Sequence, residues 1–190
     1  MLKPNKTIII SGTSGSGKTT IVRYLLSCRE FQLAFSVSAC TRKKRKTEID
    51  GKDYFFLSET DFKRKIKEDT FLEWEEVYDG CFYGSFKSST ESILKSKNIL
   101  FDVDVNGAVS IKNYFKEQAL SIFIQPSLIS VLKKRLINRQ TESIENLNIR
   151  IKKMEDELKF AKKMDYQLLN DDLSVAKKEV YNVIKVFLEK

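Results

Sequence analysis

Short apolar runs alternate with helical patterns along most of this chain. The runs have the length of buried strands and cover residues 7–11, 34–38, 98–105, 120–125 and 166–169. Elsewhere, apolar residues recur at spacings of three and four, over residues 18–28, 128–136, 147–161 and 176–187. That spacing is the period of a helix with one buried face. Buried strands that alternate with such helices predict an α/β fold, with a five-stranded parallel sheet flanked by helices.

The stretch between residues 35 and 86 breaks this rhythm. It is rich in aromatic side chains, and the turn sequences Asp50-Gly51 and Asp79-Gly80 separate its short apolar runs. A helical pattern covers about residues 59–67. We therefore expect a small β-rich insert with one helix, at about residues 37–90. The core of the fold then consists of residues 1–36 and 91–190.

A glycine loop follows the first apolar run directly. Residues 12–19, GTSGSGKT, fit the pattern G-x-x-x-x-G-K-[ST] in full, between a predicted strand and a predicted helix. In such a loop the backbone N–H groups surround phosphate oxygens, and the helix N-terminus adds positive potential. We expect Lys18 to reach the β- and γ-phosphates of ATP and the Thr19 hydroxyl to bind Mg²⁺. The alternative is a glycine-rich turn with an exposed lysine. The candidate ATP-binding residues of the loop are Gly12, Thr13, Ser14, Gly15, Ser16, Gly17, Lys18, Thr19 and Thr20.

Two carboxylates follow in the third apolar run, at Asp102 and Asp104. Ligands of open α/β sheets bind at the carboxyl ends of strands, which is where this run delivers them. Residues two apart on an extended strand face the same side. We expect Asp102 to lie near Mg²⁺ and Asp104 near the phosphate acceptor. The alternative is a pair of solvated aspartates at a strand end.

The composition removes several classes of chemistry. The chain has 190 residues and no histidine, which excludes Ser-His-Asp and Cys-His catalysis and zinc sites built on histidine. Phosphoryl transfer needs no imidazole, because its catalysis is mostly positioning and charge neutralisation. The net charge of +8 favours anionic partners without choosing among nucleotides, nucleic acid and acidic surfaces. Three widely spaced cysteines, no membrane-spanning run and no signal-peptide pattern predict a cytoplasmic protein with reduced thiols.

Further motifs follow one another along the chain. They are Phe35-Ser-Val-Ser38, Thr41-Arg42-x-x-Arg45, Asp50-Gly51-x-x-Tyr54-x-Phe56, Phe71-Leu-Glu73-Trp74, Tyr83-Gly84-Ser85, Asp102-x-Asp104-x-x-Gly107, the arginines Arg135, Arg139 and Arg150 around Thr141-Glu142-Ser143, and Asn170-Asp171-Asp172. In this order, and over nearly the whole chain, they resemble the guanylate kinase family. Lys44, Thr47 and Asn106 depart from the pattern, where the family usually has proline, glycine and glutamine.

The resemblance implies Mg²⁺-dependent transfer of a phosphoryl group from ATP to GMP, or also dGMP, in purine nucleotide metabolism. It also implies a lid at about residues 137–150, with Arg139 and Arg150 as catalytic arginines beside Lys18, Arg42 and Arg45. Arg135 and Asn170 are further candidates for ATP binding, and Thr19 and Asp102 for the metal. The implied GMP-binding residues are Ser38, Arg42, Arg45, Tyr54, Glu73, Tyr83, Ser85 and Asp104.

The residue types suit these roles. Arg42 and Arg45 belong to a run of five cations, Arg42 to Lys46, and arginines bind phosphate oxygens bidentately. Alternatives for this run are a localisation sequence, a nucleic-acid patch or a solvated face. The carboxylate of Glu73 can accept both the N1–H and the 2-amino group of guanine, while Ser38 can bond its O6 edge.

Two other classes of function stay open at this point. One is a scaffold domain of the same fold that binds proteins and catalyses nothing, although the residues of the phosphate loop are all present. The other is a kinase for a different nucleoside monophosphate, against which Glu73 and Ser38 argue. We expect no nucleic-acid or membrane partner, and either a monomer or a small homo-oligomer.

Overall fold

The computed structural model describes residues 4–13, 15–78, 80–126 and 157–190, and for Tyr78 only the backbone. Several predicted residues lie outside this part of the chain. They are Ser14 of the glycine loop, the lid at residues 137–150 and the arginines Arg135, Arg139 and Arg150. Their predicted roles therefore stay predictions.

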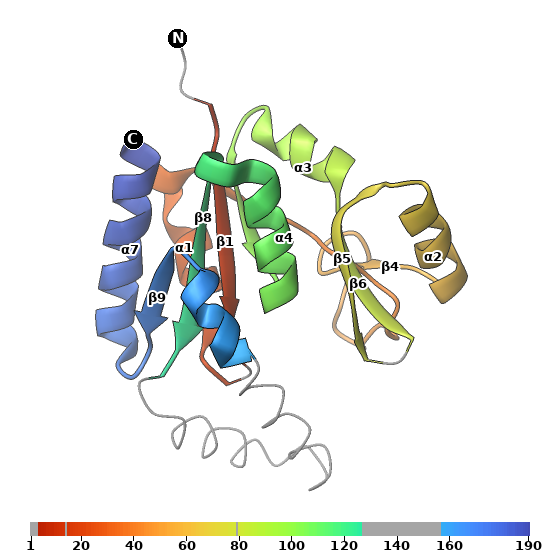
Figure 1. Cartoon of the computed structure of the whole chain (residues 1–190), viewed down its shortest axis with the longest axis horizontal. Helices are drawn as coiled ribbons and strands as arrows, with labels where there is room; N and C mark the ends of the chain where they lie inside the picture. The colour runs from red at the N-terminus through yellow and green to blue at the C-terminus, as the bar shows by residue number, and fades with distance from the viewer. Residues whose placement is uncertain (1–3, 14, 79, 127–156) are drawn as a thin grey trace, which may run out of the picture.

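The predicted parallel sheet is present in the described residues (Figure 1). It has five strands in the order β2-β7-β1-β8-β9, and each neighbouring pair is parallel. The strands are β1 (Thr7–Gly12), β2 (Leu33–Phe35), β7 (Asn98–Asp102), β8 (Ala119–Gln125) and β9 (Tyr166–Leu169). The predicted α/β fold class is thus confirmed.

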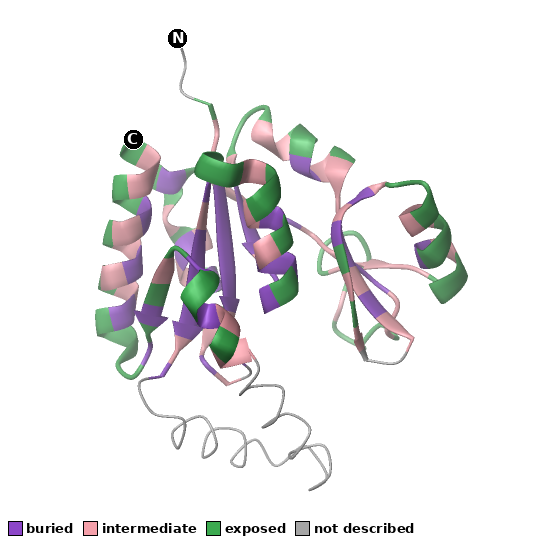
Figure 2. Cartoon of the chain, viewed as in Figure 1, coloured by how far each residue is buried: buried purple, intermediate pink, exposed green. Residues whose placement is uncertain are grey.

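Helices cover both faces of this sheet. On one face, α1 (Lys18–Ser27) and α7 (Leu173–Glu189) pack against side chains such as Ile8 and Ile10 of β1. On the other face, α4 (Val105–Phe115) and α3 (Lys87–Leu94) pack against a cluster that includes Ile9. Figure 2 shows β1 and β8 buried between the two layers. Because successive strand side chains point to opposite faces, this one short apolar run serves both hydrophobic clusters.

Burial of these strands contributes much of the stability of the core. Ile8, Ile9 and Ile10 are fully buried, and full burial of such a side chain is worth about 1.5–3 kcal/mol. Each covering helix presents a buried stripe, as its spacing predicts: Ile21, Val22 and Leu25 in α1, and Ala176, Val180 and Ile184 in α7. No helix among the described residues has the length and apolar character needed to cross a bilayer.

A second sheet stands beside the first (Figure 1). Its four described strands, in the order β4-β3-β6-β5, are β3 (Ala39–Cys40), β4 (Phe55–Phe56), β5 (Phe71–Tyr78) and β6 (Cys81–Phe86). Helix α2 (Glu59–Lys67) covers it and coincides with the predicted helix. Phe62 of α2 stacks on Phe71 and Phe82 of the sheet, with ring centroids 4.4 and 5.5 Å away. The predicted insert at about residues 37–90 contains this sheet, and its exact boundaries stay a prediction.

Short 3-10 turns connect the remaining elements. They are η1 (Arg29–Phe31), η2 (Lys116–Gln118) and η3 (Ala161–Lys163). The three cysteines, Cys28, Cys40 and Cys81, are free thiols.

One predicted strand was too long. β7 ends at Asp102, and Asp104 is the N-cap of α4, where its carboxylate accepts a hydrogen bond from the N–H of Gly107 at 2.8 Å. Aspartate is strongly preferred at an N-cap because it satisfies an unpaired helix donor. The prediction that Asp102 and Asp104 share one extended strand is therefore wrong. The run at residues 34–38 likewise extends past its strand, since β2 ends at Phe35.

Candidate active site

The glycine loop joins β1 to α1, and its glycines are required by close contacts. Gly17 is the N-cap of α1 and has a φ of 90°, in the left-handed region that glycine adopts most readily. A Cβ on Gly17 would overlap the side-chain amide of Asn170, and one on Gly12 would overlap the carbonyl of Ile124. Larger residues at either position would push the loop away from the sheet.

Asn170 supports this loop from the far end of the chain. Its Nδ2 donates a hydrogen bond to the carbonyl of Ser16 at 2.6 Å, and its backbone N–H donates to Gln125 at 2.8 Å. The residue is only 5% exposed, and Ser16 is fully buried. Asn170 was predicted to bind ATP, and direct contact with the nucleotide stays a prediction. In the structure, its amide holds the backbone that would cradle the phosphates.

A cavity of about 350 Å³ opens in front of the glycine loop. Its lining residues are Gly12, Thr13, Gly15, Gly17, Lys18, Thr19, Thr20, Asp104 and Glu157. Apart from Asp104 and Glu157, they all come from the predicted loop and the first turn of α1. A helix N-terminus behind backbone N–H groups is a ready anion site.

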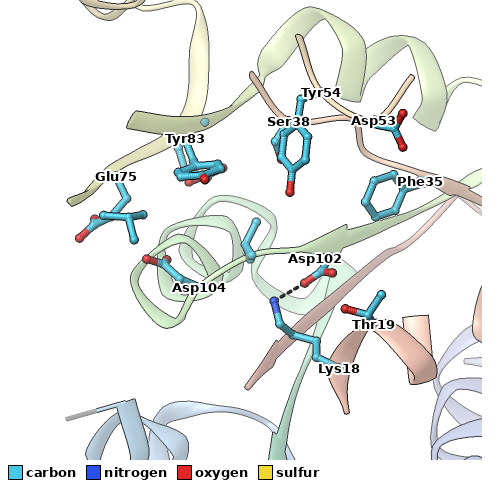
Figure 3. A pocket seen from close by; sticks show the side chains of 14 residues that line it. Lys18, Thr19, Phe35, Ser38, Asp53, Tyr54, Glu75, Tyr83, Asp102 and Asp104 are labelled. Carbon is cyan, nitrogen blue, oxygen red and sulfur yellow. Dashed lines mark hydrogen bonds and ion pairs between the residues drawn. The ribbon is translucent and has the colours of Figure 1, made fainter. Parts of the chain in front are cut away.

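A second cavity, also of about 350 Å³, adjoins the first (Figure 3). It is lined by Lys18, Thr19, Phe35, Ser38, Asp53, Tyr54, Glu73, Glu75, Val77, Tyr83, Gly84, Asp102, Val103 and Asp104. Lys18, Thr19 and Asp104 line both cavities. Figure 3 shows Tyr54 and Ser38 across the space from Lys18 and Asp102. The two compartments meet at one ammonium, one hydroxyl and one carboxylate, those of Lys18, Thr19 and Asp104.

Lys18 and Asp102 form an ion pair at this meeting point, drawn as the dashed line in Figure 3. Their side chains are 25% and 20% exposed, so the pair is open to the cavity. Thr19 lies beside it on the same wall. A phosphate that enters here meets a lysine whose charge is already partly balanced.

Glu73 lies at the buried end of the second cavity. It is 9% exposed, and its Oε1 accepts a hydrogen bond from Ser85 Oγ at 2.7 Å, across the β5–β6 pair. Burial raises the pKa of Glu73 to about 7, and the negative charges of Asp104 and Glu75 act in the same direction. A Cβ on Gly107 would lie 3.0 Å from Glu73 Oε2, so the first turn of α4 fits closely against this carboxylate.

The predicted phosphate clamp is only partly assembled. The Arg42 guanidinium lies over the ring of Tyr54, 4.7 Å from its centroid, and the rings of Tyr54 and Tyr83 are 6.0 Å apart. Burial raises the pKa of the Tyr83 phenol, which therefore stays a neutral hydrogen-bond donor. Arg45, in contrast, has a side chain that is 76% exposed. The structure thus brings Arg42, Tyr54 and Tyr83 together and leaves Arg45 at the surface.

Several lining residues escaped the sequence reasoning. Phe35, Asp53, Glu75, Val77 and Val103 line the second cavity without belonging to any quoted chemical role. Glu48 was also missed, although it forms a bidentate ion pair with Arg42. Glu48 comes two residues after the run of cations that ends at Lys46, and this closeness is the signal that could have pointed to it.

The comparisons with known proteins agree with one another. The sequence model of the guanylate kinase family matches residues 4–187. A guanylate kinase of Bacteroides fragilis is 50% identical over 184 residues, which are 96% of this chain and 90% of that one. A guanylate kinase of Porphyromonas gingivalis is 45% identical over 186 residues, which are 97% of this chain and 99% of that one.

A solved structure supports the same fold. The crystal structure of guanylate kinase from Anaplasma phagocytophilum superimposes with a TM-score of 0.76, over 98% of this chain and 87% of that chain, at 24% sequence identity. The range matched by the family model includes the glycine loop, both sheets and most of α7. On these grounds, the chain belongs to the guanylate kinase family.

Proposed function

We propose that this protein transfers the γ-phosphoryl group of ATP to the phosphate of GMP, which gives ADP and GDP. The observation that carries the proposal is the pair of cavities that share Lys18, Thr19 and Asp104. One lies in front of a phosphate-binding loop, and the other ends at the buried carboxylate of Glu73. Membership of the guanylate kinase family supports the same reaction.

The donor side supplies backbone N–H groups and one ammonium. The N–H groups of the glycine loop bind the phosphates of ATP, and the N-terminus of α1 adds its positive potential. Lys18 leaves Asp102 and turns toward the β- and γ-phosphates as they arrive. Removing this charge from Asp102 also frees the carboxylate for a cation.

Thr19 and Asp102 would hold Mg²⁺, since a hydroxyl and a carboxylate are the hard oxygen donors that this ion prefers. Among the described residues, no cluster of three or more acidic or cysteine side chains is arranged to hold a metal. The remaining ligands would be phosphate oxygens and water. Held there by Thr19 and Asp102 together with ATP, the ion would neutralise phosphate charge during transfer.

The acceptor side supplies recognition. The Glu73 carboxylate accepts the N1–H and 2-amino group of guanine, Ser85 fixes that carboxylate, and Ser38 meets the other edge of the base. Arg42, Tyr54 and Tyr83 bind the phosphate of GMP. This phosphate is already largely anionic at pH 7, so the transfer needs no general base. The chain accelerates the reaction by alignment and by neutralising charge that develops.

The remaining parts of the proposal rest on the sequence. Arg139 and Arg150, with Arg135, would swing over the transferring group from a lid at about residues 137–150. Asp104 would accept from the guanine amino group. A cytoplasmic location and a monomeric or small homo-oligomeric state complete the prediction, with ATP and GMP as partners.

The test is a coupled assay of ADP formation with GMP, dGMP, AMP, CMP or UMP as acceptor. We expect turnover with GMP, a lower rate or none with AMP, CMP and UMP, and loss of activity when EDTA removes Mg²⁺. Turnover with dGMP would show whether the ribose 2′-hydroxyl is read. Equal rates with AMP and GMP, or no ADP formation with any acceptor, would overturn the proposal.

A further inference from the structure

Glu48 was assigned no role by the sequence motifs. Its carboxylate holds Arg42 of the clamp loop, the segment of residues 41–54. Glu48 accepts a hydrogen bond from Arg42 Nη1 at 2.7 Å and another from Nη2 at 2.6 Å. Such a bidentate pair fixes the guanidinium in direction as well as in distance. We propose that Glu48 is a positioning residue for the acceptor phosphate: it holds Arg42 so that a second edge of the guanidinium faces GMP. The inference rests on the proposed function, because it concerns the phosphate of the same acceptor.

The second edge is visible in the hydrogen bonds of Arg42. Both N–H groups of Nη1 are used, one by Glu48 and the other by the carbonyl of Lys43 at 3.1 Å. Nη2 gives one N–H to Glu48. Within the described residues, the other N–H of Nη2 and the N–H of Nε have no partner, and they point in parallel along one side of the planar group. Two parallel N–H groups are the fork that binds a phosphate bidentately.

The position of the guanidinium is fixed on its face as well. Its Cζ lies 4.7 Å from the ring centroid of Tyr54 and 5.6 Å from that of Phe56. The Arg42 side chain is 17% exposed and that of Glu48 13%. Tyr54 also lines the cavity of the proposed acceptor site. Glu48 at the end and Tyr54 at the face therefore leave the guanidinium little freedom to turn.

Glu48 also closes the loop that carries both predicted clamp arginines. Its Oε2 accepts a hydrogen bond from the backbone N–H of Arg45 at 2.8 Å, and its own N–H donates to the Arg45 carbonyl at 3.2 Å. The Arg45 guanidinium is farther away, with Nη1 4.0 Å from Glu48 Oε1. One side chain thus holds Arg42 directly and sets the backbone from which Arg45 extends.

The charge of Glu48 persists well below neutral pH. The hydrogen bonds from Arg42 lower the pKa of Glu48 to about 2, with a further contribution from the Arg45 N–H. The same contact raises the pKa of Arg42, so the pair stays ionised. Neither Glu48 nor Arg42 lines the second cavity, and the pair adjoins it through the ring of Tyr54, over which the Arg42 guanidinium lies. The effect of Glu48 on the substrate passes through Arg42.

Binding of GMP and guanosine separates this role from a structural one. Guanosine has the base and ribose but no phosphate. We expect Glu48→Gln, measured by NMR titration, to weaken GMP binding roughly 10- to 100-fold, the range for hydrogen bonds to a charged group. Guanosine binding should change less than about twofold, because loss of a remote contact leaves the base site intact. In kinetics, KM for GMP should rise while KM for ATP stays the same.

A double-mutant cycle tests the route through Arg42. Once Arg42→Ala has removed the arginine, adding Glu48→Gln should change GMP binding by less than about threefold, since coupled residues do not add. Glu48→Asp keeps the carboxylate and should recover part of the affinity. Glu59→Gln is the matched control. Glu59 lies in α2, the helix that covers the second sheet, where its carboxylate pairs with Lys63 at 2.5 Å and its side chain is half exposed. The affinity of the Glu59→Gln variant for GMP should equal that of the wild type.

Any of the following outcomes would contradict the proposal. Equal losses for GMP and guanosine would make Glu48 a structural residue. Tighter binding of GMP to Glu48→Gln would mean that Glu48 competes with the phosphate for Arg42. A loss in Glu59→Gln as large as in Glu48→Gln would indicate a diffuse charge effect. If the wild-type protein binds GMP no better than guanosine, the proposed function fails and this inference with it.

Discussion

The glycine loop and the clamp loop each present a cation that is already paired with a carboxylate, but the two pairs are built differently. Lys18 pairs with Asp102, which comes from another strand and lines the same cavity. Arg42 pairs with Glu48, six positions along its own loop, outside the lining of the cavity. The ammonium is a flexible point charge, whereas the guanidinium is a planar fork with two usable edges.

The two ion pairs differ in whether binding of the substrate breaks them. We expect a triphosphate that binds Lys18 to take it away from Asp102, so that this pair is exchanged when ATP enters. A phosphate that binds the free edge of Arg42 leaves the Glu48 contact in place. We therefore expect the contact of Lys18 to be exchanged on binding, while the contact between Arg42 and Glu48 is already formed beforehand. Preorganised groups lose less conformational entropy when the ligand arrives.

The strongest way to break the comparison is removal of the donor cation. Lys18→Ala should lower kcat by at least about 100-fold, the usual loss when one charge-stabilising donor is removed from a transition state. The melting temperature should change little, because Lys18 is partly exposed and its ion pair lies near the surface. Steady-state kinetics and a thermal melt measure the two effects. Near-normal turnover in a folded variant would show that Lys18 has no part in transfer.

The next largest effect compares the two clamp arginines. Arg42→Ala should raise KM for GMP roughly 10- to 100-fold, because a charged bidentate contact is lost, and leave KM for ATP nearly unchanged. Arg45→Ala should raise KM for GMP less, since this side chain is 76% exposed, whereas that of Arg42 is 17% exposed and lies over the ring of Tyr54. Lys43→Ala and Lys46→Ala serve as controls. Equal effects of all four changes would mean that the cations act as a general positive field.

A change of pH should have a smaller effect, which we expect both in the stability of the protein and in its affinity for GMP. The pKa of Glu73, about 7 against an ordinary 4.5, means that the folded protein holds a proton here that the unfolded chain has already lost. Stability should therefore fall as pH rises from about 4.5 to 7. GMP binding should behave oppositely, because the base needs the ionised carboxylate. At pH 6 about 90% of Glu73 is protonated, so guanine binding should be about tenfold weaker than at pH 8.

Guanosine is the right ligand for that titration, because the phosphate of GMP has its own pKa near 6. Affinities of guanosine between pH 6 and 8 should follow the ionisation of Glu73 in the wild type. Glu73→Gln should show weaker binding with no such dependence, and poorer discrimination between GMP and AMP. A pH profile that is the same in both proteins would assign the titration to another group.

The smallest expected effect concerns the support of the glycine loop. Asn170→Ala removes the hydrogen bond to Ser16 and leaves a buried carbonyl without that donor. We expect KM for ATP to rise about three- to tenfold, in line with roughly 1 kcal/mol for one such bond, with KM for GMP unchanged. Asn170→Asp tests the contact from the other side, because a carboxylate cannot donate to the Ser16 carbonyl. An unchanged KM for ATP in both variants would contradict the supporting role.

The sequence predicted what depends on local pattern. β1, the glycine loop and α1 follow from a β-branched run, a complete motif and helical spacing within residues 7–28. α2 lies at its predicted bounds, and in the structure Ser58 caps it while Phe62 and Ile66 mark its buried side. The departures at Lys44 and Thr47 need no special backbone, since neither has a positive φ.

Contacts between distant segments were beyond the sequence. Asn170 and Ser16 are 154 positions apart, and no periodicity relates an amide to a carbonyl that it will meet in the fold. The exposure of Arg45 depends on how the clamp loop turns at Glu48, which the run of cations does not specify. Asp104 looked like a strand residue because the apolar pattern continues to Val105, but the cap of α4 begins there.

Asp104 has a consequence for how the two substrates influence each other. Its carboxylate borders both cavities, and the N–H of Gly107 ties it to the first turn of α4. We expect a ligand in one compartment to change the electric field at this carboxylate or its freedom to move, and so to alter binding in the other compartment. By thermodynamic linkage, the factor by which bound ATP alters the affinity for GMP equals the factor by which GMP alters that for ATP. Reciprocity holds for any pair of coupled ligands, and Asp104, which borders both cavities, is the group through which we expect the coupling to pass.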